Sequence, residues 1–212
     1  MKSGFYANMP KWKYPFYILR HPVDGYQELK NNKKFSMKAA NLILLAWIVL
    51  AILNWGYIDF DFRTNMRDVA LFQVLLTTIV IFTMVVVANW CFCTLMDGKG
   101  KMKEIWICTA YALLPYTVCG YIRFLFSYLL VYDEAVFLTY LISIAALWSF
   151  LLFLVGLSVL HEYSFPKTIG SLFLTVLGVF VMVFFAVLVS GLLVQIYSFF
   201  MTVYSEITYR ML

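Results

Sequence analysis

Two adjacent residues, His161 and Glu162, are the best candidates in this sequence for acid–base chemistry. A histidine beside a carboxylate can shuttle protons in a general acid/base reaction. Both residues follow a long apolar run, however, and the sequence supplies no nucleophile and no set of metal ligands next to them. We therefore interpret the pair as a capped, solvated helix end.

Metal binding through cysteine is the second chemistry to consider. On a helix, the spacing of Cys91 and Cys93 points the two side chains to nearly opposite faces, so they cannot easily share a metal. Since Cys behaves as a small hydrophobic residue, we expect buried free thiols. The expectation covers all the cysteines, which are Cys91, Cys93, Cys108 and Cys119.

A third candidate is the basic turn at residues 97–101, with the sequence DGKGK. It lacks the spacing of a phosphate-binding loop. We therefore predict no catalytic residue, no metal and no cofactor, and we expect that the protein is not an enzyme.

Composition indicates a membrane protein. The 212 residues are 64% hydrophobic and 13% charged, with a mean hydropathy of +0.86. Soluble domains are typically about 45–50% apolar and about 25% charged. Five apolar runs are long enough to cross a bilayer, at 37–57, 69–96, 104–131, 135–160 and 168–193.

Helices are the default for such runs, because hydrocarbon offers backbone groups no other hydrogen-bond partner. The predicted fold class is an all-α membrane protein, a bundle of five transmembrane helices. We divide the chain into a cytoplasmic, interfacial arm at 1–36 and a five-helix domain at 37–212.

The distribution of basic residues predicts the orientation. Eight of the 16 Lys and Arg residues precede position 39, and residues 99–103 and Lys167 fall on the same predicted side. Positive charge is enriched on the cytoplasmic side of membrane proteins. We therefore expect a multi-pass protein of the cytoplasmic membrane, with its N-terminus inside and its C-terminus outside.

The N-terminal arm mixes aromatic and basic residues directly before the first span. This pattern favours contact with anionic lipid head groups over nucleic-acid binding. We predict one or two interfacial helices, the second at 22–30, with Val23, Tyr26 and Leu29 as its apolar stripe. The predicted cytoplasmic contact surface, for a partner or for lipid, comprises Trp12, Tyr17, Arg20, Tyr26, Lys99, Lys101 and Lys103.

Beyond the fifth span, apolar residues continue at helical spacing to Ile207. A straight helix over 168–200 would be about 50 Å long, which exceeds a hydrocarbon core of about 30 Å. We therefore expect a bend into a helix on the outer surface.

Polar groups at membrane depth are the remaining candidates. Arg123 either faces the bundle and pairs with Asp68, Asp133 or Glu134, or reaches the outer head groups past a span that ends near Gly120. Pro115 should kink the third helix. A small-solute transporter or channel, our alternative function, would use Asn89, Pro115, Tyr116 and Arg123.

Small residues recur where they allow helices to approach closely. We expect packing within the bundle, and contact with a partner is the alternative. The residues are Gly120, Ala145, Ala146, Ser149, Gly156, Gly170, Gly178, Ala186, Ser190 and Gly191.

Several stretches together resemble the Yip domain family, in its bacterial branch. They are HPVDGYQELK at 21–30, GKGKMKE at 98–104, TAYALLPY at 109–116, HEYS at 161–164 with Lys167, IYSFF at 196–200, and YSEI at 204–207 with Arg210. Their order and spacing look like the family over essentially the whole chain. The resemblance implies five membrane helices and a cytoplasmic N-terminus.

The resemblance also bears on partners. Eukaryotic members bind Rab-type GTPases, but this chain has no counterpart of their acidic Asp-Leu-Tyr-Gly-Pro type segment, so GTPase binding is not carried over. Bacterial relatives are often associated with ATP-driven sugar importers, which implies an accessory role. We predict a non-enzymatic accessory or scaffold protein that contacts lipid, a transporter subunit or another copy of itself.

Overall fold

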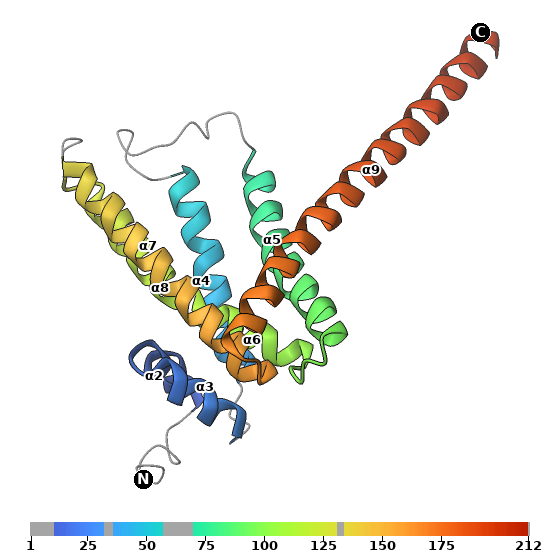
Figure 1. Ribbon diagram of the computed structural model, residues 1–212. Helices are drawn as coiled ribbons and strands as arrows, with labels where there is room; N and C mark the ends of the chain where they lie inside the picture. The colour runs from blue at the N-terminus through green and yellow to red at the C-terminus, as the bar shows by residue number, and fades with distance from the viewer. Residues whose placement is uncertain (1–10, 32–35, 57–69, 131–133, 212) are drawn as a thin grey trace.

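In a computed structural model, residues 11–31, 36–56, 70–130 and 134–211 are described. Within these ranges every regular element is helical, which confirms the all-α fold class. Figure 1 shows a bundle with one helix leaving it at an angle, and both α2 and α3 at the end nearest the N-terminus. We call this end of the bundle the basal end.

Five segments are long and apolar enough to cross a membrane, as predicted. The first two are α4 (Met37–Gly56) and α5 (Leu71–Leu95), followed by a broken third span, α8 (Ala135–His161) and α9 (Phe165–Met211). The observed bounds of the first, second and fourth spans lie within two residues of the predicted ones.

The third span is divided into α6 (Met102–Ala112) and α7 (Leu114–Phe126). Pro115 causes the break, because it has no N–H to donate and its ring is compatible only with the first turn of a helix. The predicted kink is therefore confirmed, and α7 continues beyond Gly120 to Phe126.

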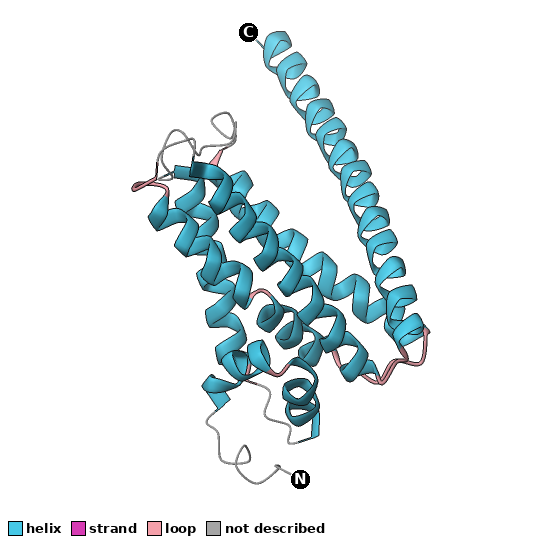
Figure 2. Cartoon of the chain, turned by 60° about the vertical axis from the view of Figure 1, so that its left-hand side comes forward, coloured by secondary structure: helices cyan, strands magenta, loops and turns pink. Residues whose placement is uncertain are grey.

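The predicted bend after the fifth span is wrong. α9 is one helix of 47 residues, about 70 Å long. Its polar residues do not interrupt it, because their hydroxyls bond back to the helix: Thr202 donates to the Ser198 carbonyl and Thr208 to the Tyr204 carbonyl. Figure 2 shows α9 running beside the bundle at its start and apart from it further along.

The N-terminal arm folds as a short 3-10 turn, Lys11–Lys13, then α2 (Tyr14–Arg20) and α3 (Pro22–Asn31). The predicted second helix is confirmed. Its apolar face packs on the basal part of α8, so that Tyr26 and Leu29 are fully buried, whereas Val23 is 48% exposed. The arm thus contributes to the same hydrophobic core as the spans.

Glycines allow tight side-chain contacts between helices inside the bundle. A Cβ at Gly120 would collide with Leu50, and one at Gly156 would collide with Cys108 and Tyr26. Packing within the bundle explains these glycines. It does not explain Gly191, where an added Cβ would meet nothing within 4 Å.

We predict that Gly156→Ala lowers the free energy of unfolding by about 1–3 kcal/mol, because the new methyl group overpacks the contact between α8, α6 and α3. Denaturant titration in mixed micelles measures the change. The control, Gly191→Ala, should raise stability by about 0.5–1 kcal/mol, since it removes a flexible residue from an open helix position. Equal effects at the two positions would contradict this packing.

Candidate functional site

Polar groups from several helices meet at the basal end, where α8 ends beside α3 and the turn before α6. We call this cluster the Glu162 junction. It comprises Lys30, Gly98, Lys99, Gly100, His161, Glu162 and Tyr163.

The backbone of Glu162 ends α8. Glu162 adopts the left-handed conformation, with φ 57° and ψ 38°, a typical way to terminate a helix. The Tyr163 N–H then donates to the Ser158 carbonyl at 3.0 Å, and the Ser158 hydroxyl donates to the Tyr163 carbonyl at 3.0 Å. The chain therefore turns sharply toward α9.

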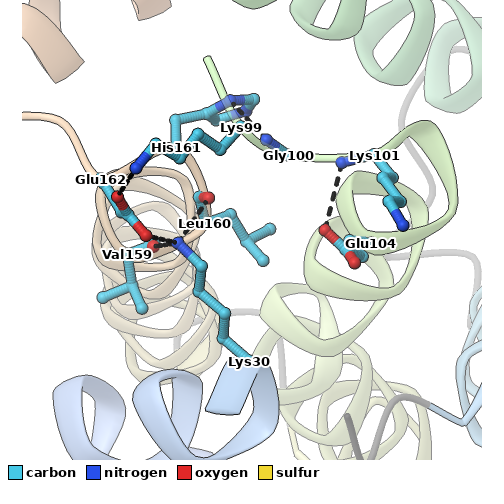
Figure 3. A network of polar contacts seen from close by, with 9 residues as sticks. All are labelled: Lys30, Lys99, Gly100, Lys101, Glu104, Val159, Leu160, His161 and Glu162. Atoms are coloured by element: carbon cyan, nitrogen blue, oxygen red, sulfur yellow. Dashed lines mark hydrogen bonds and ion pairs between the residues drawn. The ribbon is translucent and has the colours of Figure 1, made fainter.

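Lys30 and Lys99 converge on the Glu162 carboxylate (Figure 3). Lys30 Nζ lies 2.8 Å from Glu162 Oε1 and 3.1 Å from each of the Val159 and Leu160 carbonyls. A cation at this position satisfies carbonyls that the helix end leaves unpaired. Hydrogen bonds from Lys30 and Lys99 lower the pKa of Glu162 to about 2.

The other polar residue of the candidate acid–base pair is buried. His161 is 2% exposed, its ring stacks on Tyr163 with centroids 5.2 Å apart, and its Nδ1 accepts the Gly100 N–H at 3.4 Å. The expected solvated helix end is thus correct for Glu162, which is half exposed, and wrong for His161. A Cβ at Gly98 would lie 2.5 Å from His161 Nδ1, so glycine is required for this approach.

Tyr163 connects the junction to two further helices. Its hydroxyl lies 2.9 Å from the Cys93 carbonyl and 3.2 Å from the Met96 carbonyl, at the C-terminal end of α5. Lys167, in the first turn of α9, lies 4.5 Å from the centroid of its ring. Burial raises the pKa of Tyr163 to about 12, so the hydroxyl remains a donor at neutral pH.

Asn89 is a buried polar residue between α5 and α9. Its side-chain amide donates to the Thr175 hydroxyl at 3.0 Å, and Thr175 in turn donates to the Ser171 carbonyl at 2.8 Å. Interhelical bonds of this kind stabilise membrane proteins by about 0.6 kcal/mol on average. Asn89 therefore attaches the first part of α9 to the bundle.

Asn89 and the other residues of the transporter alternative have different partners. The Tyr116 backbone N–H donates to Ser149 of α8 at 3.2 Å, on the α7 side of the bundle. Arg123 is half-buried in the last turn of α7 and forms no ion pair with a described residue. Two of its candidate partners, Asp68 and Asp133, lie outside the described residues.

Residues of the predicted contact surface differ in their exposure. Trp12 and Arg20 are exposed, as are Lys101 and Lys103, and Tyr17 is half-buried beside His21. Lys99 is engaged with Glu162. Tyr26 cannot belong to a contact surface, because its ring is fully buried and its hydroxyl lies 3.5 Å from the Cys108 carbonyl.

All four cysteines are free thiols, and they differ in how deeply they are buried. Cys93 and Cys108 are buried as expected, whereas Cys91 is exposed on α5 and Cys119 is half-buried. Across the part of the chain that the structure describes, no group of three or more His, Cys, Asp or Glu side chains could hold a metal ion.

Sequence analysis missed the role of Lys30, which it counted only as one charge of the basic arm. Lys30 and Glu162 are 132 positions apart, so no local spacing links them. The left-handed conformation of Glu162 also has no signal in the sequence, because glycine is the usual residue there.

Comparison with known proteins identifies one family. A family model described as the Yip1 domain matches residues 16–189, which include α3, the broken third span and the Glu162 junction. The searches of curated proteins and of solved structures returned no match.

The ion pairs of Glu162 predict an acid-dependent loss of stability. Because its pKa is lowered from 4.5 to about 2, its contribution is complete above pH 4.5 and is lost as the pH falls toward 2. In Lys99→Gln the total loss should be smaller and should end at a higher pH, since one of the two cations that lower the pKa of Glu162 in the folded state is gone. Thermal unfolding in detergent between pH 2 and 7 measures the effect.

Lys101→Gln is the matched control, because Lys101 lies in the same turn and is in no ion pair between described residues. It should follow the wild-type pH profile. Identical profiles for Lys99→Gln and Lys101→Gln would show that the pairing with Lys99 does not hold the Glu162 carboxylate.

Proposed function

This chain belongs to the Yip1 domain family, and we propose that it is a non-enzymatic accessory protein that binds another membrane protein through α9. Its five apolar helices make it a multi-pass membrane protein. A membrane scaffold acts by presenting a surface to its partner, so the proposal rests on the surface that the bundle leaves uncovered.

The observation that carries the proposal is the uncovered part of α9. From Val183 to Tyr209 every residue of this helix is exposed. The whole helix, at about 70 Å, is much longer than a hydrocarbon core of about 30 Å. Unless α9 is strongly tilted, apolar residues such as Phe199, Phe200 and Tyr204 extend beyond the hydrocarbon, and a partner would cover them.

Small residues on this uncovered part support helix–helix contact. Ala186 and Ser190 are four positions apart, so they share one face, as in the small-xxx-small pattern of paired membrane helices. Gly191 follows, and no part of the described chain packs against it. Partner contact, the alternative account of these small residues, therefore fits this segment better than packing within the bundle.

The resemblance to bacterial Yip proteins suggests a subunit of an ATP-driven importer as the partner, and self-association through α9 is the other form of the proposal. We place the protein in the cytoplasmic membrane, with the basal end inside, from the bias of basic residues. Exposed Trp12, Arg20, Lys101 and Lys103 would add a cytoplasmic contact.

We predict that affinity purification from native membranes in mild detergent, followed by quantitative mass spectrometry, recovers one membrane protein in stoichiometric amount. Replacing Ala186 and Ser190 together by leucine should reduce its recovery at least tenfold, because bulky side chains hold the helices apart. The matched control, Leu188→Phe, adds bulk on the opposite face of α9 and should retain the partner.

Purification of the protein without a stoichiometric partner and without self-association would contradict the proposal. An equal loss of partner recovery in the double variant and in Leu188→Phe would show that the partner does not bind the face that carries Ala186 and Ser190. Flux of small solutes into liposomes that contain the purified protein would instead support the transporter alternative.

A further inference from the structure

A cavity of about 610 Å³ lies where α2 crosses the basal ends of α4 and α7. Its walls carry almost entirely apolar side chains, among them Trp12 and Phe16 from the arm, Leu42 from α4 and Val118 from α7. Its volume is within the range of about 300–1,000 Å³ that is typical of small-molecule sites. The arm therefore leaves an open space between itself and the spans.

We propose that this cavity binds one acyl chain of an anionic glycerophospholipid, with the phosphate of the lipid beside Lys38 and Lys13. The site does not depend on the protein partner proposed above, because none of its residues belongs to α9.

The polarity of the cavity changes along its length as a lipid requires. Lys38 and Ser36 lie at the basal end of α4, and the cavity continues to Ala46, which is about 12 Å further along the helix. Between them the walls are formed by residues such as Leu42 and Ile43. A charged group at the end and hydrocarbon along the wall would both be accommodated.

Hydroxyl groups in the wall are already engaged within the protein. Thr117 donates to the Leu113 carbonyl at 2.9 Å, and Tyr121 donates to the Ala46 carbonyl at 2.7 Å. A polar ligand would gain few hydrogen bonds there and would lose those that it makes to water. Hydrocarbon loses nothing on entry, so an acyl chain fits this wall better than a polar metabolite.

Charge at the mouth selects the head group. Lys38 is exposed and forms no ion pair with another described residue. Lys13 Nζ lies 5.2 Å from the centroid of the Trp12 ring, which lines the cavity. Each basic residue close to an anionic membrane surface contributes about 1 kcal/mol of attraction. Trp12, which is 63% exposed, is of a residue type that is enriched at membrane interfaces.

The experiment measures lipid retention by native mass spectrometry of the full chain, after incubation in detergent with equal amounts of phosphatidylglycerol and phosphatidylcholine that have identical chains. We expect one retained phosphatidylglycerol per protein. Lys38→Gln should weaken its binding about fivefold, as expected for the loss of one surface cation. Lys167→Gln, which removes an exposed cation that does not line the cavity, should leave binding unchanged.

Blocking the cavity tests the acyl chain separately. Val118→Trp should abolish retention, whereas Ile144→Trp, on an exposed face of α8 outside the cavity, should not. Leu42→Trp serves as a second blocking variant if thermal unfolding shows that Val118→Trp is misfolded, since Leu42 is 69% exposed.

Equal retention of the two lipids would overturn the recognition of an anionic head group. Full retention by the folded blocking variant would overturn the site itself. If glycerol 3-phosphate displaces the lipid at a concentration similar to that of the lipid, the acyl chain does not contribute to binding, and this part of the proposal is overturned.

Discussion

The carbonyl groups at the end of α8 need hydrogen-bond donors, and Lys30 supplies them from the arm. A helix end leaves about four carbonyls unpaired, and leaving them buried without partners is costly. By bonding to two of these carbonyls and to Glu162, Lys30 fixes α3 beneath the bundle. The position of α3 then sets that of α2, and α2 forms one wall of the open cavity whose other walls are α4 and α7.

Sequence alone predicted the parts of the fold that depend on local chemistry. The spans follow from apolar length, and the break before Pro115 follows from its missing N–H. The prediction from sequence failed where contacts between residues far apart in the chain determine the structure. The exposure of Tyr26 depends on which face of α3 meets α8, which lies far along the chain. The length of α9 is a local feature that was also mispredicted, because hydroxyls such as that of Thr202 bond within the helix and leave it uninterrupted.

The candidate site also combines residues that are noticeable in the sequence with contacts that the sequence does not predict. The glycines at 98 and 100 and the pair His161–Glu162 are visible as unusual residues, but their contact joins segments that are about 60 positions apart. The family match covers residues 16–189, so it includes this junction and ends within α9. The junction is thus part of the shared domain, whereas the distal part of α9 lies outside the matched residues.

The first part of α9 is held by Asn89, by the stack of Lys167 on Tyr163 and by packing on α5, while the helix is uncovered from Val183 to Tyr209. A rigid rod fixed at one end acts as a lever. For the uncovered part from Val183 to Tyr209, which is about 40 Å long, a rotation of about 5° where it leaves the bundle moves the far end by about 3.5 Å. A small rearrangement of helix ends on one side of the membrane is therefore amplified into a displacement of several ångströms at the opposite end.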